Sequence, residues 1–309
     1  MNPCPKPLIF ERPLRGCVAA GCETRSEATG GTVQALARRS SQALPIPAPM
    51  PTMRPLLRLE YGLEATGRIL NIAAYLFTHI EHPAECKPQL LARARELALK
   101  GTVLLAREGI NLFLAGEPQK VELWLSELMA EPLFAALKVK RQHSNRQPFA
   151  RMKVKVKREL VPLGERNLPL EALDAARITP VQLRQWLDQG RKFVLLDTRN
   201  QFEFEQGTFN HAQSLGLRCF RDFPSAVEAQ LGHCREQPIV AFCTGGIRCE
   251  KAAPLMQQLG FSEVYQLDGG ILNYFAECGS AHYQGDCFVF DERIGVDSAL
   301  APSEDLAAS

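Results

Sequence analysis

Hydrophobic and polar positions divide the chain into a first part without periodicity and a later part with a clear one. Residues 1–67 carry prolines in two clusters and no sustained apolar repeat, so we expect this segment to be disordered. A start of translation at Met50 or Met53 is an alternative explanation of the segment. From Arg68 onward the apolar positions recur regularly, and they predict folded domains.

The first predicted domain spans residues 68–158. Residues 68–77 predict a strand, and residues 87–101 predict a helix with Pro88 near its start and Gly101 as its C-terminal cap. Two apolar runs around the turn 107–109 predict a hairpin.

A second helix and two more strands complete this domain. The helix is predicted over 119–134, with Val121, Leu125 and Leu128 on one side, and strand patterns follow within 137–145 and 148–160. The order strand, helix, strand, strand, helix, strand predicts an N-terminal ferredoxin-like (α+β) domain.

A linker over 159–177 precedes a second predicted domain at 178–281, and a C-terminal tail is expected over 282–309. Thr179 as N-cap, Pro180 at the first helical position and Gly190 beyond the end predict a helix. Short apolar strands within 192–199, 238–243 and 262–270 alternate with helical stretches. This alternation predicts a parallel sheet covered by helices.

Cys243 follows one of these strands, where ligands of parallel sheets gather. Residues 243–248, Cys-Thr-Gly-Gly-Ile-Arg, form the cysteine loop, and a helix is predicted from about Cys249 to Leu259. Gly245 and Gly246 tolerate positive φ, so the loop can turn backbone N–H groups inward. Those donors and the positive end of the helix stabilise an anionic sulfur. We therefore predict that Cys243 is a reactive thiolate with a lowered pKa.

The length of the loop indicates which chemistry it suits. Cysteine phosphatases enclose phosphate with five residues between cysteine and arginine, whereas four residues separate Cys243 from Arg248. The tighter loop suits a single added sulfur atom, as in a persulfide. Thr244 and Ile247 complete the predicted active-site loop, in which Arg248 holds either a substrate phosphate or acidic neighbours.

Three further residues are supporting candidates. Asp197 and Arg199 follow a strand at the same sheet edge, so Asp197 is expected to bond the loop backbone and Arg199 to meet an anion, with a structural salt bridge between them as the alternative. Cys249 either resolves an oxidised Cys243 or points into the core.

Cys278, His282 and Cys287 offer three ligands without a fourth, so no metal site is predicted.

Charge and composition limit the partners. The chain has 36 Lys and Arg against 34 Asp and Glu, so a polyanion requires a local basic surface. We expect such a surface, the basic strip, on one face of a strand: Arg151, Lys153, Lys155 and Lys157, with Met152, Val154 and Val156 toward the core. The strip indicates contacts with a phosphate backbone, or an edge strand that lysines protect from aggregation.

The absence of a long apolar run predicts no membrane partner and a cytoplasmic protein with mostly reduced thiols.

The segments that begin at 108 (EGIN), 195 (LLDTRNQFEFEQGTF), 220 (FRDFP), 242 (FCTGGIRCEKA), 265 (YQLDGGILNYF) and 285 (GDCFVFDER) together resemble the rhodanese-domain tRNA uridine hydroxylase family. The similarity runs from about Arg68 to Asp297. It implies a rhodanese-like second domain and an oxygen-dependent conversion of the wobble uridine, tRNA position 34, into 5-hydroxyuridine. Cys243 then matches the essential, persulfide-type cysteine of the family.

Three hypotheses follow. In the first, the basic strip positions the anticodon arm of tRNA and the uridine unstacks toward Cys243, with molecular oxygen as co-substrate and no evident organic cofactor. In the second, the protein is a sulfurtransferase that passes a persulfide to a thiol or cyanide, and a sulfur donor protein is a possible partner. In the third, it is an RNA-binding or redox-sensing module with an inert loop.

Overall fold

In the computed structural model the described residues are 68–164, 168–289 and 295–300. They belong to one unit that runs from Pro51 to Ser309. The predicted disorder of residues 1–67, the alternative start at Met50 or Met53 and part of the predicted C-terminal tail lie outside the described residues.

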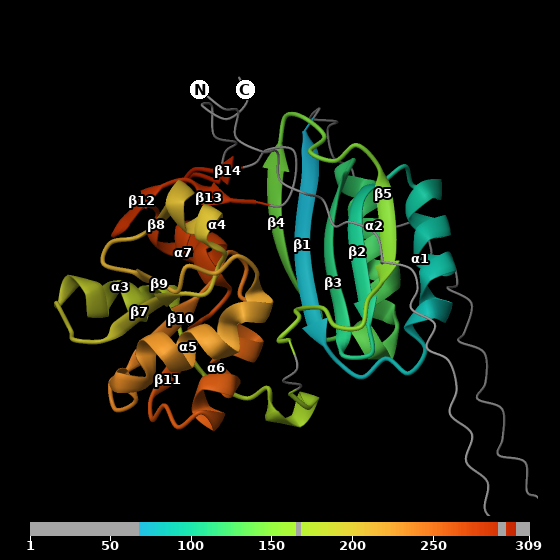
Figure 1. The fold of residues 1–309 in the computed structure, drawn as a ribbon. Coiled ribbons are helices and arrows are strands. Elements are labelled where there is room, and N and C mark those ends of the chain that lie inside the picture. Colours follow the sequence, from blue (N-terminus) through green and yellow to red (C-terminus); the bar gives the residue numbers. More distant parts are fainter. Residues whose placement is uncertain (1–67, 165–167, 290–294, 301–309) are drawn as a thin grey trace, which may run out of the picture. The chain divides into compact units, whose positions relative to one another are not determined.

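The first domain is a five-stranded sheet with two helices (Figure 1). Its elements are β1 (Ile69–Phe77), α1 (Pro83–Glu96), β2 (Lys100–Ala106), β3 (Gly109–Gly116), α2 (Pro118–Ala130), β4 (Lys138–Ser144) and β5 (Met152–Val156). The strand order is β4-β1-β3-β2-β5, with antiparallel neighbours except for the parallel pair β2 and β5. This is the predicted ferredoxin-like arrangement, and β5 extends it at one edge.

Successive side chains of β1 point to opposite faces of this sheet. Leu70, Ile72 and Ala74 are buried on the face that α1 and α2 cover. The intervening residues, among them Tyr75, point to the opposite face, here called the outer face. Residues in cross-strand register with them share it, including Asn111 opposite Tyr75 and Lys140 opposite Ala73.

Helix α1 differs from its prediction at both ends. It begins at Pro83 with Pro88 inside it, and it ends before Ala98, which takes a left-handed φ of 55°. Gly101 is therefore not a helix cap. It lies in β2, where a Cβ would come within 2.1 Å of the Phe113 carbonyl oxygen, so close strand packing requires glycine there.

The second domain contains the predicted parallel sheet, which has five strands in the order β6-β11-β10-β7-β9; β6 and β9 were not among the three predicted strands. Its strands are β6 (Ala176–Ile178), β7 (Val194–Asp197), β9 (Gln213–Ser214), β10 (Ile239–Phe242) and β11 (Val264–Leu267). Its helices are α3 (Pro180–Asp188), α4 (Gln201–Gln206), α5 (Phe223–Leu231), α6 (Cys249–Gln258) and α7 (Gly270–Cys278). Thr179 caps α3 through a reciprocal hydrogen-bond pair with Gln182, and Gly190 follows with a φ of 61°.

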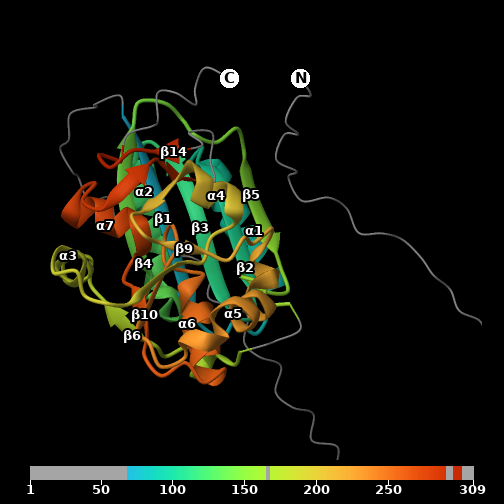
Figure 2. The ribbon, with the colours of Figure 1, turned by 60° about the vertical axis from the view of Figure 1, so that its left-hand side comes forward.

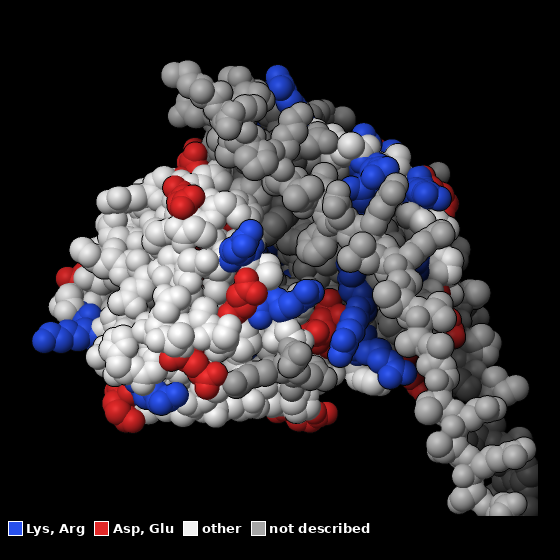
Figure 3. All heavy atoms as spheres, in the orientation of Figure 1, with Lys and Arg blue, Asp and Glu red and all other residues white. Residues whose placement is uncertain are grey.

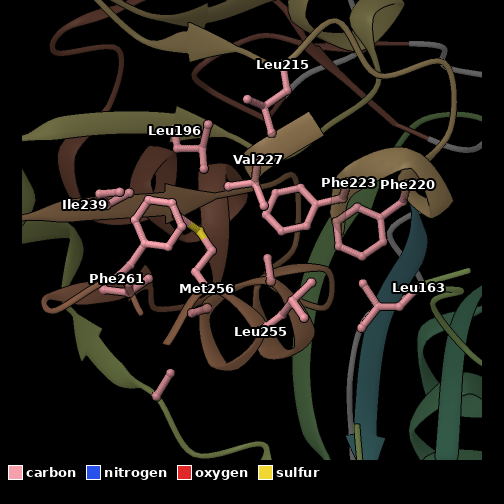
Figure 4. Close-up of a cluster of buried hydrophobic side chains, with 14 of the residues drawn as sticks. Leu163, Leu196, Leu215, Phe220, Phe223, Val227, Ile239, Leu255, Met256 and Phe261 are labelled. Atoms are coloured by element: carbon pink, nitrogen blue, oxygen red, sulfur yellow. The ribbon is translucent and has the colours of Figure 1, made fainter. Parts of the chain in front are cut away.

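Both faces of the parallel sheet are buried. Figure 4 shows one cluster, in which Leu196 and Ile239 of the sheet lie among Val227 of α5 and Met256 of α6. The opposite cluster joins Leu195 and Val240 to residues of α3 and α7. Figure 2 shows α5 and α6 next to each other. Helices therefore cover both sides and leave the carboxyl edge of the strands for the cysteine loop.

The chain after residue 281 adds to the second domain. Strand β12 (Tyr283–Gly285) pairs with β8 (Gly207–Phe209), and β13 (Cys287–Phe288) pairs with β14 (Gly295–Val296). Cys287 and Val296 are fully buried in the second cluster. The segment expected to be a tail thus contributes core residues. Among the described residues, no helix is both long and apolar enough to span a membrane.

Candidate active site

The cysteine loop connects β10 to α6 as the sequence predicts. Cys243 follows the last residue of β10, is 1% exposed, and accepts a hydrogen bond at its Sγ from the Gly246 N–H at 3.1 Å. Gly246 has a φ of 99°, which explains the glycine, whereas Gly245 does not take a positive φ. The loop therefore needs its special backbone conformation at one of the two predicted glycines.

The surroundings of Cys243 stabilise a thiolate. Burial disfavours the charge, but a hydrogen bond from the Cys249 thiol, the positive charge of Arg248 and the backbone N–H groups of Arg248 and Gly246 outweigh it. They lower the pKa of Cys243 to about 6. An ordinary cysteine has a pKa of about 8.5, so Cys243 is mostly ionised at neutral pH.

Cys249 is buried beside Cys243 at the start of α6. Its sulfur lies 3.7 Å from the Thr198 hydroxyl oxygen. Burial and the hydrogen bond to the neighbouring thiolate raise the pKa of Cys249, so it remains a protonated donor. The structure thus brings the two thiols together, which a resolving role requires, although Cys249 is also part of the buried interior.

The start of α7 supports the cysteine loop from outside. The N–H of Ile271 donates to the Cys243 carbonyl at 3.0 Å, and the N–H of Leu272 donates to the Thr244 carbonyl at 3.1 Å. Gly270 has a φ of 66°, and a Cβ there would lie 2.3 Å from the Cys243 carbonyl oxygen. Close contact between the loop and α7 therefore requires glycine at 270.

Arg248 pairs with an acidic neighbour, one of the two roles predicted for it. Its guanidinium is 3.0 Å from the carboxylate of Glu203, which is fully buried in α4. The same arginine lines the cavity beside Cys243. Glu203 was not predicted to be a site residue, although it lies within a segment that carries the family resemblance.

Asp197 and Arg199 form the structural salt bridge that was the alternative prediction. Both side chains are fully buried, and the guanidinium lies 2.7 Å from the carboxylate. Asp197 also accepts from the Thr208 hydroxyl, and Arg199 donates to the Gly207 carbonyl. The Asp197 carboxylate thus bonds Arg199 and Thr208 in place of the loop backbone expected for it, and neither Asp197 nor Arg199 lines the cavity. The pair instead joins β7 to β8.

A cavity of about 550 Å³ lies between the cysteine loop and the outer face of the first domain. The loop side contributes Cys243, Thr244, Gly245, Ile247 and Arg248, and the sheet side contributes Tyr75, Phe77, Asn111, Phe113 and Lys140 among others. Its volume lies in the range of ordinary small-molecule sites. Cys243 is thus at the boundary of a cavity that both domains form.

Sequence reasoning missed the polar residues that meet the loop from the first domain. The Tyr75 hydroxyl donates to Glu250 of α6 at 2.8 Å, and Arg177 donates to the same carboxylate at 2.8 Å. Burial, followed by the charge of Glu250, raises the pKa of Tyr75, so its hydroxyl stays protonated. Lys140 donates to the carbonyls of Gly245 and Gly269. Lys140 is placed here by the register of β4 with β1, which the sequence pattern alone does not give.

The four residues of the basic strip lie along β5 and its two ends. Lys153 is in register with Thr102, which is in register with Phe113 of the cavity. The strip and the cavity therefore share the outer face. Burial and then the charges of Lys157, Lys153 and Arg151 lower the pKa of Lys155, which places the four cations near one another. Figure 3 shows Lys and Arg side chains in several separate groups over the first domain.

One neighbour of the strip differs from its prediction. Val154 faces the core, but Val156 is 40% exposed. Strand β5 is an edge strand and ends at Val156, so the helical layer no longer covers that position. Within the part of the chain that the structure describes, no group of three or more His, Cys, Asp or Glu could hold a metal ion.

Family models match both domains. One described as the UPF0176 acylphosphatase-like domain matches residues 69–160, and one described as the rhodanese-like domain matches residues 179–277. A solved rhodanese-like domain from Anabaena sp. covers 36% of this chain and 80% of its own, with 20% identity and a TM-score of 0.32.

Three curated relatives are similar over most of their length, and each is named tRNA uridine(34) hydroxylase. The protein from Bordetella parapertussis is 48% identical and the match covers 76% of this chain and 98% of that protein. The protein from Xanthomonas oryzae pv. oryzae is 46% identical, and the match covers 77% of this chain and 96% of that protein. The protein from Cupriavidus pinatubonensis is 44% identical, and the match covers 76% of this chain and 86% of that protein.

Proposed function

The chain belongs to the tRNA uridine(34) hydroxylase family, and from that premise we propose that it hydroxylates the wobble uridine of tRNA, position 34, to 5-hydroxyuridine. The observation that carries the proposal is a thiolate-stabilising loop at the wall of a cavity whose other wall is the outer face. Cys243 is therefore a wall residue of the cavity that a molecule would enter between the two domains.

The reaction replaces the C5–H bond of uracil with C5–OH and is of the monooxygenase type. Molecular oxygen is the co-substrate. One oxygen atom enters the base, and the other leaves as water with two protons and two electrons from a thiol reductant. No organic cofactor takes part in this scheme. Cys243 supplies the reactive protein group, and Gly246 with Arg248 keeps it ionised.

The substrate enters as an unstacked nucleotide of the anticodon arm. Carbon 5 of a stacked base is not accessible to a buried sulfur, so the uridine must leave the stack. The aromatic side chains of Tyr75, Phe77 and Phe113 line the cavity and offer surfaces on which a base can stack. The basic strip on the same face binds the phosphate backbone outside the cavity.

A sulfur donor protein charges Cys243 in this proposal. The Cys243 thiolate attacks the terminal sulfur of a donor persulfide, the donor S–S bond breaks, and the donor leaves as a thiolate. The four-residue spacing of the cysteine loop suits the single added atom. A sulfurtransferase as the whole function is not favoured, because the relatives at 44–48% identity carry the hydroxylase name.

Mass spectrometry of tRNA nucleosides tests the proposal. Cells with the gene should contain a wobble uridine that has gained one oxygen atom, and cells without the gene should lack it. Complementation with the Cys243→Ser variant should not restore the modification, because a hydroxyl group is not ionised at neutral pH. Cys219→Ser is the matched control, since that thiol is exposed and outside the cavity. An added sulfur in place of oxygen, or full activity of Cys243→Ser, contradicts the proposal.

A further inference from the structure

Three consecutive carbonyl groups of the cysteine loop are held from outside the loop. The carbonyls of Cys243 and Thr244 accept from the first turn of α7 at 3.0 and 3.1 Å. The carbonyl of Gly245 accepts from the Lys140 ammonium at 3.0 Å. The third donor thus comes from β4 of the other domain, 105 positions earlier in the chain. Two of the three carbonyls are therefore bound by α7 and the third by Lys140.

The carbonyl of Gly245 and the N–H of Gly246 belong to one peptide unit. A trans peptide is planar and points these two groups in opposite directions. The Gly245 carbonyl points to Lys140, and the Gly246 N–H points to Cys243 Sγ at 3.1 Å. Glycine on both sides leaves this peptide with few steric barriers to rotation. Its orientation therefore depends on what binds the carbonyl.

We propose that Lys140 is a positioning residue for Cys243, because it holds the Gly245–Gly246 peptide in the orientation that points the Gly246 N–H at the cysteine sulfur. Lys140 also donates to the Gly269 carbonyl just before α7, so one ammonium group fixes the loop and the element that supports it. The inference rests on the proposed role of Cys243 as a reactive thiolate. It makes the first domain part of the catalytic centre as well as a surface for RNA.

The charged and titratable groups around this contact come from every neighbouring element. Cys249 of α6 and Arg248 of its own loop lower the pKa of Cys243, and the charge of Cys243 in turn raises the pKa of Tyr75 of β1 and opposes the lowering of the pKa of Lys140 of β4. Lys140 is influenced by Cys243, by Asp268 before α7 and by Cys287 of β13. Desolvation lowers the pKa of Lys140 to about 8, so the ammonium is still charged where Cys243 titrates.

The rate of alkylation of Cys243 by iodoacetamide, followed by peptide mass spectrometry on the full chain from pH 4.5 to 9.5, tests the proposal. Lys140→Met removes the donor, and the pH midpoint of alkylation should rise by about half a pH unit. Lys140→Gln keeps a neutral donor and should shift it less. Lys138→Met is the matched control, because Lys138 is an exposed residue of the same strand that also lines the cavity. Its midpoint should equal that of the wild type.

Two results overturn the proposal. An unchanged midpoint in a folded Lys140→Met variant excludes any effect on the sulfur. Equal shifts for Lys140→Met and Lys140→Gln indicate that only the charge acts, without positioning. Lys140→Ala replaces the methionine variant in both comparisons if the latter does not fold. Because alkylation needs neither tRNA nor oxygen, a negative result here leaves the proposed hydroxylation untouched, and loss of the hydroxylation proposal leaves this readout intact.

Discussion

The cysteine loop and the outer face line the same cavity, but they are built in different ways. The loop is local: the sulfur, the Gly246 N–H and Arg248 lie within six consecutive residues. The outer face is assembled by strand register, which brings Tyr75 of β1 and Lys140 of β4 to a cysteine more than 100 residues away. The comparison teaches that ionisation of the sulfur is largely a property of a short segment, whereas its orientation and access depend on the whole first domain.

The largest effect is expected where the two regions touch. A Cβ at Gly246 would lie 2.9 Å from the Tyr75 hydroxyl, and the positive φ there disfavours any side chain. Gly246→Ala should lower the free energy of unfolding by about 1–3 kcal/mol and slow alkylation of Cys243 at neutral pH. Chemical denaturation and labelling measure the two effects.

Gly245→Ala is the matched control, because a Cβ there meets nothing within 4 Å. It should leave stability and labelling close to wild type. The double variant Gly246→Ala, Tyr75→Phe should lose less stability than the sum of the two single variants, because Tyr75→Phe costs the hydrogen bond to Glu250 but removes the steric contact with the Cβ added at Gly246. Equal behaviour of the two alanine variants would contradict the account of this loop.

The sequence predicted the local cysteine loop better than the outer face, which strand register assembles. The strand, the cysteine, the loop and the helix start at 249 are adjacent in the chain, so composition and spacing predicted them. The cap assigned to Gly101 was wrong, because that glycine satisfies a close approach to β3 that only the sheet register reveals. The roles of Tyr75, Lys140 and Glu203 could not be predicted, since each depends on a partner far along the chain.

A smaller effect should appear on the sheet side. The double variant Lys153→Gln, Lys155→Gln removes two cations from the basic strip but does not touch the cysteine loop. The slope of the logarithm of tRNA affinity against the logarithm of salt concentration should decrease in magnitude by about 1.5, because each lost phosphate contact contributes roughly 0.7–0.9 to that slope. Filter binding at several salt concentrations measures this slope.

The control for the strip is Lys87→Gln with Lys120→Gln, on the helices that cover the opposite face. This pair should leave the slope unchanged. The alkylation midpoint of Cys243 should be the same in both double variants. An equal loss of slope in both would show that net charge, rather than the strip, governs tRNA binding.

The smallest effect is expected within the loop side. Cys249→Ala removes the thiol that donates to Cys243, and the alkylation midpoint should rise by about half a pH unit. Cys249→Ser keeps a donor and should stay closer to wild type. If Cys249 also resolves an oxidised Cys243, peroxide treatment should give a disulfide between them in the wild type, which non-reducing peptide mapping detects. Equal midpoints in both variants would remove Cys249 from the account of the thiolate.

The pH dependence of Cys243 alkylation in the unmodified protein tests the central claim most directly. Only the thiolate reacts, so labelling should be fast above the pKa of Cys243 and lost as the pH falls through it. The account predicts a midpoint near pH 6. A midpoint near 8.5, the value of an ordinary cysteine, would contradict it, because the loop would then hold a neutral thiol.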